Sequence, residues 1–157
     1  MKGEIRIVDD LAGPSARLRA LIHWGPVALY AGLIFYLSAQ SHLDEDLPSF
    51  LDIFGDKVLH AVEYAGLGAL CYRAFRRGAS GLPASRVLLL AVVAASLYGI
   101  TDEVHQLFVP FRESSWQDWV ADTVGAVLGA VGVMSCPAVF SDTAHGKTSG
   151  YSNRMSE

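Results

Sequence analysis

Four long apolar blocks constrain the fold of this chain more than any other feature. The most apolar of them read LIHWGPVALYAGLIFYLSA, from Leu21, and VLLLAVVAASLYGI, from Val87. A bilayer core about 30 Å thick is crossed by roughly 20 apolar residues in a helix, whereas a surface helix of a soluble domain buries only one apolar stripe. The blocks therefore indicate an integral membrane protein.

The boundaries of these blocks predict an all-α membrane protein, a bundle of four transmembrane helices. We expect the helices at residues 21–39, 56–75, 83–108 and 116–136. β-Strands are excluded because the blocks are too long and lack alternation of apolar and polar residues. The first block also exceeds the apolar region of a signal peptide, which indicates an uncleaved anchor.

The same boundaries divide the chain into one transmembrane domain and two polar tails. We expect the tails at residues 1–19 and 137–157, and the domain at residues 20–136. The C-terminal tail is polar and rich in serine, a composition that is typical of disorder.

The distribution of basic residues predicts the orientation of the bundle. Lys and Arg accumulate in the cytoplasmic loops of membrane proteins. In this chain they lie in both tails and around the loop after the second block, where Arg73, Arg76, Arg77 and Arg86 are found. The segment 40–55 contains only acidic charges. Both termini are therefore expected in the cytoplasm, with the two acidic loops outside.

Ionisable and amide side chains recur at one depth of this predicted bundle, near its outer face. They are Asp56, Lys57, His60 and Glu63 in the second block, Asp102, Glu103 and Gln106 in the third, Arg112 in the following loop, and Asp118 and Asp122 in the fourth. Charges inside a membrane are costly and normally face the bundle interior. We expect these ten side chains to converge in one site.

Helical phase supports this convergence. Asp56, His60 and Glu63 fall within about 60° of one another at 100° per residue. Asp118 and Asp122 share a face with Gly125 and Gly129, and small residues at that spacing allow close packing of helices. In the third block, Glu103 and Gln106 line up with Gly99, and Asp102 lies beside them.

The charges of this set do not balance, because six carboxylates accompany two fixed cations, Lys57 and Arg112. Carboxylates with unequal environments are suited to acid–base chemistry. A plainer interpretation also holds for Asp56 and Asp118, which would simply begin helices and interact with the helix dipole. Covalent catalysis is disfavoured, since no activated Ser or Cys is evident.

Charge and cysteine content narrow the function classes. The formal net charge is −4 and no dense basic tract is present, so nucleic acid is not an expected partner. Cys71 and Cys136 form neither a disulfide framework nor a CxxC metal motif. We expect both to be small buried hydrophobic residues.

Two runs of sequence resemble the VanZ-like family of bacterial integral membrane proteins. They are DKVLHAVEYAGLG, from Asp56, and YGITDEVHQLFVPFRESSWQDWVADTVGAVLG, from Tyr98. The family pattern Asp-Lys-x-x-His falls on Asp56, Lys57 and His60, and Asp-Glu-x-x-Gln-x-x-x-Pro-x-Arg falls on Asp102, Glu103, Gln106, Pro110 and Arg112. Its third motif, Asp-x-x-x-Asn/Asp-x-x-Gly, falls on Asp118, Asp122 and Gly125. The resemblance covers roughly residues 22–133, and Asp122 stands where many members carry Asn.

The resemblance implies a multi-pass protein of the bacterial cytoplasmic membrane. The family is named for a protein associated with low-level resistance to teicoplanin, a glycopeptide antibiotic, which implies a role at the cell envelope. The expected partners are the lipid bilayer and a lipid-linked or cell-wall substrate. No protein partner is indicated.

Three functions remain open at this stage. In the first, an intramembrane site acts on an envelope substrate: His60, Glu63, Asp102, Glu103 and Asp122 form the catalytic set, and Asp56, Lys57, Gln106, Arg112 and Asp118 bind substrate. In the second, His60, Glu63, Asp102 and Asp122 hold a divalent cation, although no cofactor is identified by a motif. In the third, the protein is a scaffold or modulator, and the polar residues only lock the helices together.

Overall fold

The four predicted helices form an antiparallel bundle. A computed structural model describes residues 15–40, 49–78, 81–110, 112 and 114–136, and for residues 49–54 it describes the backbone alone. The helices are α1 (Ala16–Ser38), α2 (Ser49–Gly78), α3 (Ala84–Gln106) and α4 (Trp116–Met134). The described residues contain no strand. The all-α prediction is therefore confirmed.

Several predicted boundaries require correction. Helix α2 begins at Ser49 rather than at Asp56, and α1 begins at Ala16 rather than at Leu21. The prediction followed the continuous apolar blocks, whereas a helix continues beyond such a block wherever its backbone hydrogen bonds can form. The interpretation that Asp56 begins a helix is therefore wrong. Asp118 does lie in the first turn of α4, after the N-cap Ser115.

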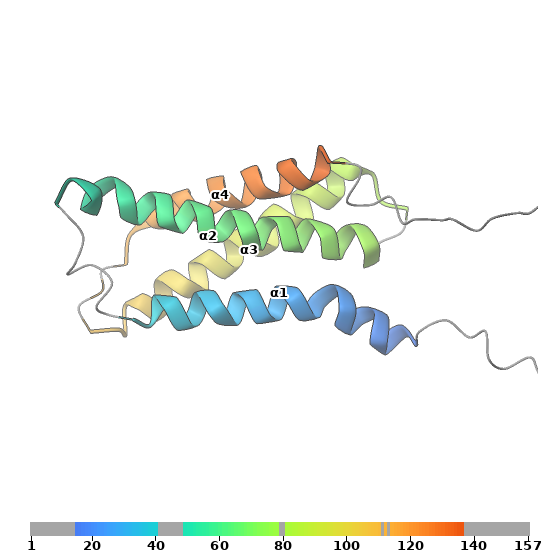
Figure 1. Cartoon of the computed structure of the whole chain (residues 1–157), viewed down its shortest axis with the longest axis horizontal. Coiled ribbons are helices and arrows are strands. Elements are labelled where there is room, and N and C mark those ends of the chain that lie inside the picture. The colour runs from blue at the N-terminus through green and yellow to red at the C-terminus, as the bar shows by residue number, and fades with distance from the viewer. Residues whose placement is uncertain (1–14, 41–48, 79–80, 111, 113, 137–157) are drawn as a thin grey trace, which may run out of the picture.

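Helix α1 lies at the side of the bundle and packs mainly against α2 (Figure 1). Trp24 meets Phe75 edge to face, with ring centroids 4.8 Å apart, and the Tyr98 hydroxyl donates to the Ala31 carbonyl at 2.6 Å. Pro26 lies inside α1. Proline removes one backbone hydrogen bond from a helix interior and favours a bend there.

Helices α2 and α4 form the closest pair because glycines let their backbones meet. A Cβ added to Gly125 would lie 2.8 Å from Ala61 Cα, and one added to Gly129 would lie 2.8 Å from Ala65 Cα. Gly68 meets Ala126 in the same way from the other helix. Small residues at this spacing are typical of tightly packed membrane helices.

The bundle has an apolar exterior and an interior rich in small and polar residues. Large apolar side chains are exposed on all four helices, for example Leu29 on α1, Val62 on α2, Leu89 on α3 and Leu128 on α4. The core contains several alanines beside Tyr64, Leu67 and similar residues. A soluble protein buries such apolar side chains, so this distribution suits a lipid environment.

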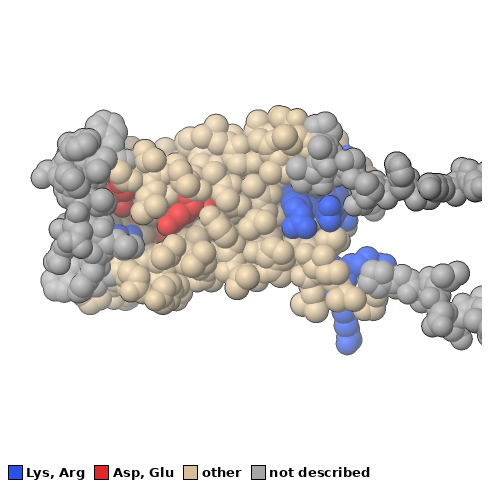
Figure 2. Space-filling view, viewed as in Figure 1, with Lys and Arg blue, Asp and Glu red and all other residues tan. Residues whose placement is uncertain are grey.

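Two helices, α1 and α3, are long and apolar enough to cross a membrane by length and composition. Helix α2 carries charged residues toward both of its ends, which lowers its hydropathy. The two ends of the bundle also differ in charge. Basic residues gather at the end where α1 begins and α2 ends, and carboxylates lie toward the other (Figure 2).

The two cysteines differ in environment. Cys71 is buried in the core, but Cys136 is exposed just after α4. The expectation of a buried residue is therefore wrong for Cys136. The end of an apolar block does not show where the helix ends. Cys136 lies beyond Met134, the last residue of α4.

Candidate functional site

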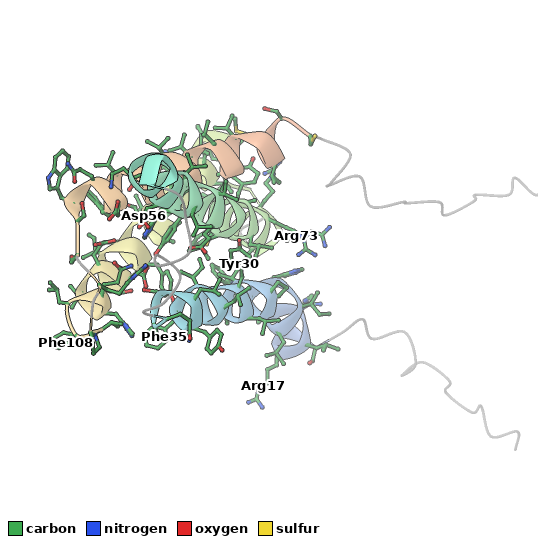
Figure 3. The ribbon with its side chains drawn as sticks, turned by 60° about the vertical axis from the view of Figure 1, so that its left-hand side comes forward. Arg17, Tyr30, Phe35, Asp56, Arg73 and Phe108 are labelled. Carbon is green, nitrogen blue, oxygen red and sulfur yellow. The ribbon has the colours of Figure 1, made fainter. Side chains whose placement is uncertain are left out.

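Buried polar side chains gather at the end of the bundle where α2 and α4 begin and α1 and α3 end. Among the described residues, those classed as buried and polar or charged are Ser38, His60, Asp102, Glu103, Gln106, Asp118 and Asp122. Figure 3 shows Asp56 toward this end, whereas Arg17 and Arg73 project at the other. The ten residues that the sequence singled out are called the polar cluster from here on.

A contact between α2 and α4 lies at the centre of the polar cluster. His60 Nδ1 and Asp122 Oδ1 are 2.9 Å apart, and the side chains are 6% and 0% exposed. A carboxylate at this distance fixes the ring orientation and favours a proton on Nδ1. Gly99 of α3 leaves room for the aspartate, because a Cβ there would lie 3.0 Å from Asp122 Oδ2.

A second contact between the same helices lies one turn nearer the end of the bundle. Lys57 Nζ donates to Asp118 Oδ1 at 2.6 Å. The side chain of Lys57 is 40% exposed, whereas that of Asp118 is 5% exposed. Asp56 is also partly exposed, and its Oδ1 lies 3.9 Å from His60 Nε2. The rim of the cluster is therefore open, and its centre is closed.

Helix α3 connects the cluster to α1. Gln106 Nε2 donates to Ser38 Oγ at 3.2 Å and lies 3.4 Å from Asp102 Oδ2. All three residues are buried. The amide of Gln106 thus positions Asp102 and ties the C-terminal end of α1 to the site.

The segment before α4 holds Glu103. The Ser115 backbone N–H donates to Glu103 Oε2 at 2.8 Å, and the Ser114 hydroxyl donates to the same oxygen at 3.0 Å. Two hydrogen bonds to one oxygen stabilise a carboxylate there. The other oxygen, Glu103 Oε1, is left toward the interior with no hydrogen-bond partner in the described structure.

Glu63 and Arg112 complete the set. Glu63 is half-buried on α2 and interacts electrostatically with Arg112, His60 and Asp102. Arg112 lies in the segment after α3, where its backbone N–H donates to the Val109 carbonyl at 3.3 Å. The second fixed cation of the cluster thus comes from a connecting segment, as its sequence position implies.

The structure brings all ten residues to one end of the bundle and joins them through short contacts or electrostatic interactions. Asp122 interacts with Glu103 and Asp102 in addition to His60. His60 also acts on Glu103. No predicted site residue is directed to the opposite end. Their roles in chemistry remain proposals, which are developed below.

Several buried polar atoms of the cluster and of the neighbouring Tyr64 have no hydrogen-bond partner within the described residues. They are Tyr64 Oη, Asp102 Oδ1, Glu103 Oε1 and Asp122 Oδ2. Leaving a buried polar group unpaired costs about 1–3 kcal/mol. A cluster that served only to lock helices together would satisfy its polar atoms more completely. The unpaired atoms indicate capacity for a ligand, for water or for a cation.

Two groups of side chains have the donor types and spacing of a cation site. They are His60 with Glu103 and Asp122, and His60 with Asp56 and Asp118. In each group one ligand atom per residue lies within 4.8 Å of the others. The set expected from the sequence shared His60 and Asp122 with the first group but contained Glu63 and Asp102 in place of Glu103.

Sequence reasoning missed four residues that contact the cluster. Tyr64 is fully buried and interacts electrostatically with Asp102 and Asp122. Ser38, Ser114 and Ser115 bind Gln106 or Glu103. A lone serine at a helix end or in a connecting segment does not stand out in the sequence as a site residue. The position of Tyr64, one residue after Glu63, was a weak indication that it lies near the site.

Comparison with known proteins identifies the family. The VanZ/LLP1 family model matches residues 10–138, which is most of the chain and includes all four helices. No curated protein and no solved structure matches the chain significantly. On the strength of the family match and of an all-helical bundle with apolar outer faces, this chain belongs to the VanZ/LLP1 family.

Proposed function

We propose that all four helices cross the cytoplasmic membrane of a bacterium, with both termini in the cytoplasm. Exposed apolar side chains on every helix support this arrangement. The basic residues at the end where α1 begins would lie in the cytoplasm, in accord with the usual bias of Lys and Arg. The polar cluster would then lie near the outer leaflet.

Cysteine labelling in intact cells tests the orientation. Cys136 is exposed and Cys71 is buried, so both are first replaced, by Ser and Ala respectively. Single cysteines are then introduced as Glu45→Cys and Ser80→Cys. A membrane-impermeant maleimide should label the first variant and label the second only after lysis. If Ser80→Cys alone is labelled in intact cells, the topology is the reverse of the one proposed.

We infer that the polar cluster binds the polar headgroup of an envelope or lipid-linked substrate and exchanges a proton with it. The observation that carries this proposal is the combination of an open rim with an incompletely paired centre. Asp122 orients His60 at 2.9 Å, as a carboxylate orients a general acid or base. Lys57 and Arg112 supply the positive charge that a phosphate or carboxylate group would need.

The other residues divide between proton transfer and positioning. Glu63, Asp102 and Glu103 lie around His60 and Asp122, and they would share protons with the reacting group. Asp56, Gln106 and Asp118 would hold the substrate or the side chains that bind it. Asp118 acts through Lys57 at 2.6 Å, and Gln106 acts through Asp102.

One observation favours the scaffold as a second candidate. Contacts of the cluster join α2 to α4, α3 to α1 and α3 to the segment before α4. A set of polar contacts between helices can specify their arrangement without chemistry. The glycine contacts between α2 and α4 already hold that pair together, however, and this weakens the need for a polar lock.

A complementation experiment separates the two candidates. A strain lacking the gene is complemented with the parent, with His60→Ala or with His23→Ala, a matched variant distant from the cluster. Teicoplanin sensitivity and the pool of lipid-linked cell-wall intermediates are measured together with membrane abundance. The site predicts that His60→Ala fails to complement at normal abundance while His23→Ala complements. Equal complementation by both variants would reject the site.

A further inference from the structure

Three buried side chains from three different helices converge at the centre of the polar cluster. They are His60 of α2, Glu103 of α3 and Asp122 of α4, which are 5%, 7% and 0% exposed. One nitrogen or oxygen of each lies within 4.8 Å of those of the other two. Residues distant in sequence thus offer one imidazole and two carboxylates to a common point.

Two oxygens of this trio have no partner within the described structure. Glu103 Oε1 and Asp122 Oδ2 are buried and accept no hydrogen bond there. The opposite oxygen of each carboxylate is occupied, by Ser114 and Ser115 for Glu103 and by His60 for Asp122. These carboxylates are therefore fixed in orientation while each retains a free ligand atom. Oriented donors of this kind are typical of metal sites.

We propose that His60, Glu103 and Asp122 bind one divalent transition-metal cation, with Zn²⁺ or Mn²⁺ as the fitting ions. Mixed imidazole and carboxylate ligands suit these ions better than Ca²⁺ or Mg²⁺, which prefer oxygen alone. This inference deepens the proposed function and rests on it for the role of the ion toward substrate.

The distances between ligand atoms of the three residues are compatible with a small ion. Adjacent ligand atoms around Zn²⁺ or Mn²⁺ lie about 3.0–3.4 Å apart when metal–ligand distances are about 2.0–2.2 Å. His60 Nδ1 and Asp122 Oδ1 are already 2.9 Å apart. One carboxylate oxygen of Glu103 lies within 4.8 Å of a ligand atom of each of the other two residues.

The charge of the cluster favours a cation in this position. Six carboxylates face two fixed cations, Lys57 and Arg112. Four of these negative charges are not balanced by Lys57 and Arg112, and like charges interact strongly where water is excluded. A divalent ion at the trio neutralises the charge of the two carboxylates that bind it. With three protein ligands it also keeps an open position for a phosphate or carboxylate oxygen.

The other group of donors is a weaker candidate for the same ion. It shares His60 but uses Asp56 and Asp118. Lys57 Nζ already contacts Asp118 at 2.6 Å, and a second cation beside that ammonium group would be repelled. Asp56 is also 35% exposed on its side chain. The fully buried trio therefore carries the proposal, and the second group supplies a control.

Direct metal binding by the full-length protein tests the proposal. The protein is purified in detergent, treated with EDTA and dialysed against Zn²⁺ or Mn²⁺, and bound metal is measured by elemental analysis. We expect one ion per chain. Asp122→Asn and Glu103→Gln should each weaken binding at least about 10-fold, because both retain side-chain shape and hydrogen bonding but lose ligand charge. His23→Ala should bind as the parent does, and Asp118→Asn should weaken binding less than either ligand variant does.

Each outcome decides the proposal. No bound ion in the parent overturns it, as does equal binding in all variants or a loss confined to Asp118→Asn. Elution of each variant at the volume of the parent on size-exclusion chromatography shows that the chain is folded, and His60→Ala provides a third ligand test. An absent ion beside a complementation defect in His60→Ala would reject the cation and leave the proposed function standing. A bound ion in the parent beside full complementation by His60→Ala would support the cation site and reject the proposed function.

Discussion

The contact between α2 and α4 has two halves of different composition, one of small residues and one of polar residues. Toward the basic end of the bundle, Gly125 and Gly129 of α4 meet Ala61 and Ala65 of α2 backbone to backbone. Toward the other end, the same helices face each other through His60, Lys57 and two aspartates. The first half gains dispersion energy from backbones in close contact. The second carries excess charge and unsatisfied oxygens.

This difference indicates which half holds the bundle together. Association of helices in lipid depends mainly on close packing, and the small-residue half supplies that without charged groups. Polar groups buried in an incompletely satisfied network are costly. The polar half is therefore best explained by what it binds or does, while the small-residue half maintains the geometry that the cluster needs.

The largest expected effect comes from disturbing the small-residue half. Gly129→Ala places a Cβ against the Ala65 backbone, so the helices must separate. We expect the free energy of unfolding to fall by about 3 kcal/mol. Gly132→Ala is the matched control, because nothing lies within 4 Å of its added Cβ. Thermal unfolding in detergent measures the stability of both variants. Equal stability of the two would contradict the conclusion that the small-residue half holds α2 and α4 together.

A smaller effect is expected from the ion pair at the rim. Lys57→Met leaves Asp118, which is 5% exposed on its side chain, without its ammonium partner. Because Lys57 is partly open to solvent, water can replace part of the lost interaction. We expect a loss of about 1–2 kcal/mol in the free energy of unfolding. The double variant Lys57→Met with Asp118→Asn should recover part of it, and failure to recover would show that the pair is not coupled.

The smallest effect is expected at the centre of the polar half. Asp122→Asn removes one carboxylate from a set with excess negative charge, and the amide oxygen can still accept from His60. We expect metal-free stability equal to the parent or higher by up to ~1 kcal/mol. Chemical denaturation in EDTA checks this. A loss of several kcal/mol would mean that the carboxylate is a structural requirement.

Apolar block length predicted the four helices, because a membrane-length helix needs a continuous apolar run. It did not predict where they begin: α2 starts at Ser49 and α1 at Ala16, in sequence whose polarity says nothing about backbone hydrogen bonding. The faces of α3 and α4 followed from helical phase, since Glu103, Gln106 and Asp122 are all buried.

The fine structure of the cluster was beyond sequence reasoning. The contact of Ser38 with Gln106 depends on how far α1 reaches along α3, which no local pattern encodes. The hydrogen bonds from Ser114 and Ser115 to Glu103 depend on the path of a connecting segment. Helical phase alone could not decide between Glu63 and Glu103 as the carboxylate beside His60 and Asp122, because that choice depends on the relative rotation of three helices.

Thermal stability of His60→Ala beside Gly129→Ala, in EDTA and with membrane abundance measured in parallel, tests the central claim most directly. If the polar half is a site, His60→Ala should unfold close to the parent, since the small-residue half holds α2 and α4 together, and its abundance should be normal. Gly129→Ala should lose both thermal stability and membrane abundance. A His60→Ala variant as unstable and scarce as Gly129→Ala would contradict the account and make the polar cluster a structural lock.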